Sequence, residues 1–80
     1  MKNPNGANVE LIYRQIGMRI EQLRTTLGWT QADLAKKLGY TRVSVTNIEI
    51  GRQRIPVHQV LEICKVFGTT PKHFLRGIWT

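Results

Sequence analysis

The side chains that could support catalysis or metal binding are few in this 80-residue chain and poorly placed for either. The acidic, histidine and cysteine residues are Glu10, Glu21, Asp33, Glu49, Glu62, His58, His73 and Cys64. No Ser/His/Asp set or carboxylate pair has an arrangement suited to catalysis. His58 and Cys64 lie six residues apart on one expected helix and therefore on opposing sides of it. We expect no enzymatic activity, no metal site and no cofactor, and we assign Cys64 to the core.

A second set of side chains is suited to hydrogen bonding with the edges of bases. The segment 41–54 reads TRVSVTNIEIGRQR, and at helical spacing one face carries Val45, Ile48 and Glu49. The opposite face carries Arg42, Val43, Thr46 and Asn47. Arginine can fork onto guanine and asparagine onto adenine, threonine can donate or accept, and valine methyls can contact a thymine methyl. A helix about 10–12 Å across also fits the roughly 12 Å major groove.

The residues that flank this segment could hold a nucleic-acid backbone. Gln31 begins an expected helix, where its amide and free main-chain N–H groups can meet a phosphate. Arg52 and Arg54 lie in the loop that follows Gly51. Each could equally face water when taken alone, but together on one side of one motif they favour phosphate contacts.

Composition limits the class of protein. The formal charge of +7 and the pI near 10.4 indicate an anionic partner, either nucleic acid or a membrane surface. No stretch approaches the roughly 18 consecutive apolar residues of a membrane helix, and a single cysteine allows no internal disulfide. We expect a cytoplasmic protein with a flexible tail at residues 1–7 and one domain at residues 8–80.

Caps, glycines and apolar spacing predict five helices and no strand. The first runs from the N-cap Asn8 to Gly28 and the second from Thr30 to Gly39, and the third follows the cap Thr41 and ends at Gly51. The fourth begins at Pro56, and the fifth follows Thr70 and Pro71. Inward residues of the last three helices are expected to be Val45, Ile48, Val60, Leu61, Cys64, Phe67, Phe74 and Leu75. A short hairpin at 42–46 is the rival interpretation, because those residues alternate and are partly β-branched.

Sixty residues of the chain resemble a known family. From Ile16 to Leu75 the pattern is Leu-Arg, then Thr-Gln-x-x-Leu-Ala-x-x-Leu-Gly, then Thr-x-x-Ser-Val-x-x-Ile-Glu-x-Gly, and finally the late Pro and Phe-Gly. This spacing is similar to that of the phage-repressor (Cro/Xre-type) helix-turn-helix family. The resemblance implies an all-α, lambda-repressor-like bundle of five helices, whose third helix enters the major groove, usually as a two-fold dimer on a palindromic operator.

Matching positions in that family imply a role for individual residues. Arg24 and Glu49 match an ion pair that ties the first helix to the third, and Glu49 would need such a partner because it points inward. Val43 and Ile50 depart from the family, which often has polar residues there. The DNA-contacting set implied by position and by the flanking loop is Gln31, Thr41, Arg42, Val43, Ser44, Thr46, Asn47, Arg52 and Arg54.

The apolar residues Ile55, Val57, Ile78 and Trp79 are expected at a surface shared by two copies, although Trp79 could instead fold back on its own core. The sequence therefore predicts a transcription factor of the repressor type that binds double-stranded DNA as a homodimer. A DNA-binding antitoxin or restriction-modification controller, with a toxin or polymerase as protein partner, is one alternative. A protein-interaction adaptor that does not bind DNA is another.

Overall fold

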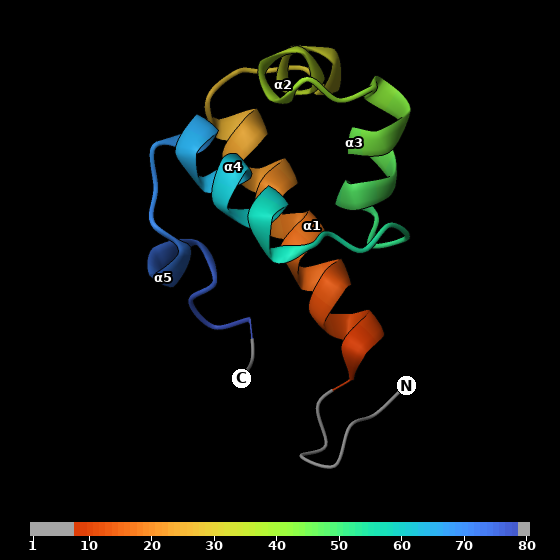
Figure 1. The fold of residues 1–80 in the computed structure, drawn as a ribbon, viewed down its shortest axis with the longest axis vertical. Coiled ribbons are helices and arrows are strands. Elements are labelled where there is room, and N and C mark those ends of the chain that lie inside the picture. Colours follow the sequence, from red (N-terminus) through yellow and green to blue (C-terminus); the bar gives the residue numbers. More distant parts are fainter. Residues whose placement is uncertain (1–7, 79–80) are drawn as a thin grey trace.

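The computed structural model describes residues 8–78, and the regular elements in that range are all helices. They are α1 (Val9–Thr26), α2 (Gln31–Leu38), α3 (Arg42–Glu49), α4 (Val57–Phe67) and α5 (Pro71–Phe74). Figure 1 shows α1 as the long helix, with α2 beyond its C-terminal end and α3 beside it. The five-helix expectation is confirmed, and the rival hairpin at 42–46 is wrong because those residues form the first half of α3.

Side-chain caps explain where the helices begin. Asn8 Oδ1 accepts from the main-chain N–H of Leu11 at 3.0 Å, and Thr41 and Thr70 cap α3 and α5 in the same way. Thr30 forms a reciprocal capping box with Asp33, in which the Thr30 N–H donates to the Asp33 carboxylate and lowers the pKa of Asp33. These caps are the ones that the sequence indicates.

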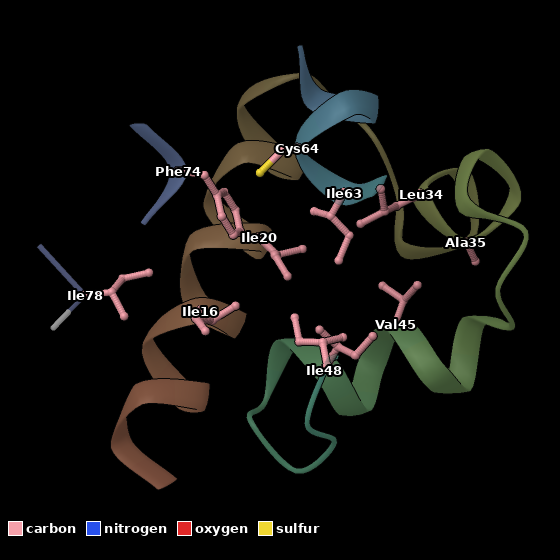
Figure 2. Close-up of a cluster of buried hydrophobic side chains, with 11 residues drawn as sticks. Ile16, Ile20, Leu34, Ala35, Val45, Ile48, Ile63, Cys64, Phe74 and Ile78 are labelled. Carbon is pink, nitrogen blue, oxygen red and sulfur yellow. The ribbon is translucent and has the colours of Figure 1, made fainter. Parts of the chain in front are cut away.

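The core lies where all five helices meet, as Figure 2 shows. Its side chains are apolar residues from each helix, from the α3–α4 connection and from the segment after α5: Ile16, Ile20, Leu34, Ala35, Val45, Ile48, Ile55, Ile63, Cys64, Phe74 and Ile78. α3 packs against both α1 and α2, while α4 contacts α2 and α5. Cys64 is buried as expected, and its burial raises the pKa of the thiol. One face of α3 is thus packed against α1 and α2.

The inward face of α4 matches the expected one in part: Cys64 is in the core, and Val60 and Phe67 pack against it. Pro56 is the N-cap and Val57 the first helical residue, and the buried pair is Ile63 with Cys64. Leu61, expected inward, is 50% exposed, whereas Ile63 is fully buried. A helix with apolar residues on more than half its circumference can bury only one stripe, and spacing alone did not fix which one. Leu75, also expected inward, is the C-cap residue after the short α5 and is exposed.

Two residues expected at a shared surface lie inside the single chain instead. Ile55 and Ile78 are 4% and 7% exposed and pack within the core, so their side chains are not available to a second copy. Val57 is 76% exposed, and Trp79 lies outside the described residues.

Two glycines let the third helix and its C-terminal turn approach α1. A methyl group at Gly17, in the middle of α1, would overlap the main-chain carbonyl oxygens of Ile48 and Glu49. Gly51 follows α3 with a φ of +78°, and a Cβ there would lie 2.8 Å from the Cα of Arg14. Both positions therefore require glycine, the second for two reasons. The orientation of α3 depends on these two contacts.

None of the helices within residues 8–78 is long and apolar enough to cross a membrane.

Candidate nucleic-acid interface

The outer face of α3 is centred on Val43, Asn47 and Ile50. Val43 is 69% exposed and Ile50 is 50% exposed, while Asn47 is partly covered. Arg42, at the start of the helix, is exposed. The buried face carries Val45, Ile48 and Glu49, as their spacing predicts. Three of the residues that the sequence predicts to contact bases, Arg42, Val43 and Asn47, are therefore at least partly accessible on α3.

Thr46 lies on the flank of α3 that adjoins α2, where a glutamine braces it. Thr46 Oγ1 donates to Gln31 Oε1 at 2.8 Å and lies 3.0 Å from the Arg42 carbonyl oxygen. Gln31 Nε2 donates to Glu49 Oε1 at 3.0 Å. The Gln31 side chain, expected to reach a phosphate, is thus engaged at both ends by α3. Its main-chain N–H at the start of α2 still belongs to the free N–H groups of that helix.

The ion pair between Arg24 and Glu49 lies directly behind this brace. Arg24 Nε donates to Glu49 Oε2 at 2.6 Å, and Nη2 donates to Oε1 at 3.0 Å. The hydrogen bond to Glu49 raises the pKa of Arg24. Arg24 Nη1 also donates to the Trp29 carbonyl oxygen at 2.8 Å, which ties the turn before α2 into the same network. A single guanidinium therefore links α1, the α1–α2 turn and α3.

A second amide braces the opposite flank of α3. The Gln53 amide lies within 3.1–3.3 Å of the Ser44 hydroxyl. The main-chain N–H groups of Arg52 and Gln53 both donate to the Asn47 carbonyl oxygen, at 2.9 and 3.2 Å. The loop after α3 is thereby closed onto the helix. Gln53 was not among the sequence-predicted residues, since a loop glutamine carries no signal of its partner.

The basic loop borders an open groove of about 760 Å³ between the N-terminal turns of α1 and the residues after α3. Three arginines line it, Arg14 from α1 and Arg52 and Arg54 from the loop, together with one carboxylate, Glu10. The Arg54 guanidinium lies 5.7 Å from the centre of the Tyr13 ring, a cation–π contact that positions it. Arg14 extends the basic surface beyond the residues expected from the sequence, and Tyr13 supports Arg54 within it.

This arrangement is a helix-turn-helix: α2 and α3 are joined by a tight turn at Gly39, and the outer face of α3 is framed by polar and basic groups. A family profile described as a helix-turn-helix domain matches residues 15–75. The chain belongs to this family, and its fold is that of DNA-binding transcription regulators of the repressor-like type.

Solved structures of two proteins of this class are similar to the chain at 26–27% identity. The restriction-modification controller C.AhdI from Aeromonas hydrophila has 26% identity and a TM-score of 0.72, covering 78% of this chain and 90% of that one. The P22 c2 repressor, solved in complex with a synthetic operator, has 27% identity and a TM-score of 0.69, covering 78% and 94%.

The clp gene regulator ClgR from Corynebacterium glutamicum shares the fold, with 20% identity and a TM-score of 0.77 over 81% of this chain and 83% of that one. A search of curated protein sequences finds no match. The first turns of α1, which carry Arg14 and Tyr13, precede the residues matched by the family profile.

Proposed function

We propose that this chain is a sequence-specific, double-stranded DNA-binding transcription regulator, a repressor that binds a palindromic operator as a homodimer with α3 in the major groove. The observation that carries the proposal is the exposed outer face of α3. Arg42, Val43 and Asn47 remain accessible there, while Glu49 and Val45 hold the helix from behind. The P22 c2 repressor, of the same fold, is solved on an operator.

The roles of the interface residues follow from their chemistry. Arg42 and Asn47 present donor and acceptor groups to base edges, and Val43 presents methyl groups. Arg52 and Arg54 contact phosphates on the loop side, and the N-terminus of α2 with Gln31 and Thr41 near the turn contacts the strand on the other side. Ser44 contributes to the loop side while it is bonded to Gln53. Phosphates would set the register, and bases would select the site.

Two copies would place their α3 helices about 34 Å apart, one turn of the duplex. Val57 and Leu61 lie one helical turn apart on the exposed side of α4 and offer an apolar surface for the second copy. A restriction-modification controller role is the second candidate, because C.AhdI is similar over 90% of its length. Such a controller would bind DNA through the same face, so the two roles differ in the regulated gene.

Selection of bound duplexes from a random pool tests the DNA-binding proposal. We expect a two-fold symmetric motif with half-sites about 10 base pairs apart. Arg42→Ala together with Asn47→Ala should relax preference at the positions that they read, at a cost of about 1–3 kcal/mol for each lost bidentate contact. Lys72→Ala, on α5 and away from α3, is the control and should leave the motif unchanged. A folded chain that binds no duplex of any sequence would overturn the proposal.

A further inference from the structure

Polar side chains connect the interior of the molecule to the outer flank of α3 through hydrogen bonds whose direction is fixed by chemistry. The Arg24 guanidinium can only donate, and the Glu49 carboxylate that pairs with it can only accept. The Gln31 amide must therefore turn its NH₂ end toward Glu49, where Nε2 lies 3.0 Å from Oε1. The reverse orientation would set two acceptors against each other.

The amide orientation determines what Thr46 can do. Gln31 Oε1 faces Thr46 Oγ1 at 2.8 Å and can only accept, so the hydroxyl must donate. The other oxygen beside this hydroxyl, the Arg42 carbonyl oxygen at 3.0 Å, is also an acceptor. A threonine hydroxyl has a single proton, and either contact uses it inside the protein. Toward the outside Thr46 presents lone pairs and a methyl group.

We propose that Thr46 is a specificity-determining residue that acts as a hydrogen-bond acceptor and selects a base with an exocyclic amino group. This inference rests on the proposed function and refines it. In the major groove the amino groups belong to cytosine N4 and adenine N6, whereas guanine O6 and thymine O4 are acceptors. Threonine ordinarily pairs with either kind of group. Here the buried ion pair, acting through Gln31, leaves only one of the two choices.

The expected size of the effect follows from a single hydrogen bond. A base that sets a carbonyl oxygen against Thr46 leaves two acceptors facing each other without a proton between them, and both lose their water on binding. We expect about a tenfold weaker affinity for such a base, and a similar loss when the amino group is removed from the preferred one.

Base analogues and one isosteric variant test this assignment. In the selected operator, each adenine in turn is replaced by purine and each cytosine by pyrimidin-2-one, which lack the amino group, and the Kd is measured for the wild type and for Thr46→Val. Valine keeps the shape and the methyl group but has no oxygen. At one position in each half-site, removal of the amino group should weaken wild-type binding about tenfold and leave Thr46→Val binding unchanged.

Thr25→Val is the matched control, because the Thr25 hydroxyl also donates to the carbonyl oxygen four residues back, Glu21, at 2.9 Å, but on α1. It should retain the wild-type response to every analogue. Thr46→Ser keeps the hydroxyl and should also show the wild-type response to the analogues. If melting shows that Thr46→Val is unfolded, Thr46→Ala is used in its place.

Two outcomes would overturn the acceptor role: equal losses for wild type and Thr46→Val at every position, or a Thr46-dependent preference for guanine or thymine oxygen. A wild-type chain that binds no duplex would instead overturn the proposed function itself, so the two failures are distinguishable.

Discussion

The carboxylate of Glu49 accepts from three donors, two on Arg24 and one on Gln31, and its side chain is 1% exposed. Glu49→Ala would leave the Arg24 guanidinium without its partner in the interior. Removing one member of a buried pair costs about 3–5 kcal/mol. We expect denaturant unfolding to show a loss of that order, with a smaller change in which bases are preferred.

Glu21→Ala is the control for this variant, because Glu21 is an exposed carboxylate on α1 near the same arginine. Its effect on stability should stay within about 0.5 kcal/mol. Unchanged melting of Glu49→Ala together with an altered operator preference would contradict a structural role for Glu49.

Tyr40, in the turn between α2 and α3, has a pKa raised to about 12, first by burial and then by the hydrogen bond that its hydroxyl donates to Glu62. The ordinary value is 10.0, so the unfolded chain loses this proton before the folded one. The folded state is therefore at full stability below pH 10 with respect to this group, and it loses stability as the pH rises toward 12.

Absorbance at alkaline pH measures this directly, since the chain has two tyrosines. One phenol should titrate near pH 12, and Tyr40→Phe should remove that step. Glu62→Gln should lower the pKa of Tyr40 without restoring the ordinary value, because burial is the larger cause. A wild-type titration with no step near pH 12 would contradict the burial of Tyr40.

At the scale of the elements, the contact between α1 and α3 depends on Gly17. A glycine inside a helix ordinarily costs about 1 kcal/mol relative to alanine, so Gly17→Ala would be stabilising if space allowed. The carbonyl oxygens of Ile48 and Glu49 occupy that space. We expect Gly17→Ala to lower the unfolding free energy by about 1–3 kcal/mol, the range for overpacking, and to weaken DNA binding by shifting α3.

The neighbouring exposed residue provides a control for Gly17. Met18 is 60% exposed, and Met18→Ala should change neither stability nor binding by more than about 0.5 kcal/mol. A Gly17→Ala protein that is more stable than the wild type would show that the two helices can separate at no cost.

The N-terminal turns of α1 should contribute to DNA affinity without contributing to specificity. Arg14 shares a groove with Arg52 and Arg54, which places it along the proposed phosphate path. We expect Arg14→Gln to weaken binding to all duplexes alike and to reduce the slope of log affinity against log salt by about one. Lys72→Gln removes the same charge on α5 and should leave the slope unchanged; equal slopes for both variants would remove Arg14 from the interface.

The positions of the helices could be predicted from the sequence because their caps are local. Thr30, Thr41 and Thr70 each satisfy a main-chain N–H three residues ahead, and this chemistry is readable without a fold. The buried face of α4 could be predicted only in part, since Leu61 was expected inward and Ile63 was not. Val60, Leu61, Ile63 and Cys64 are all apolar, so the choice between stripes depends on tertiary packing.

The candidate interface could be predicted only in part, because spacing within one helix is visible in the sequence and contacts between distant segments are not. Helical spacing separates Val43 and Asn47 from Val45 and Ile48, and it does so correctly for α3. Contacts between distant segments, such as Gln31 with Thr46 or Gln53 with Ser44, have no spacing to reveal them. The need for glycine at position 17 could not be predicted either, because the sequence does not show which main-chain atoms of α3 pack against it.

At the scale of the whole molecule, charge and assembly should act together. A dimer that neutralises about 6–10 phosphates would lose a factor of about 10³ to 10⁵ in affinity between 50 and 200 mM salt.

Val57→Asp should shift the protein toward monomers in sedimentation and make operator binding fall steeply on dilution, because it places a charge in the proposed shared surface. Met18→Asp changes an exposed apolar residue on α1 and serves as the control. Identical sedimentation of the two variants and the wild type at all concentrations would contradict this surface.

The glutamines on either flank of α3 have a thermodynamic consequence. Because Gln31 and Gln53 already fix the helix in the free protein, association would not have to fold it. The heat capacity change on binding would then reflect only the apolar surface hidden between protein and duplex, with no added share from ordering the protein chain. Calorimetry at several temperatures would therefore give a heat capacity change close to the value expected for the buried apolar surface alone. Any heat capacity change beyond that value would come from the DNA.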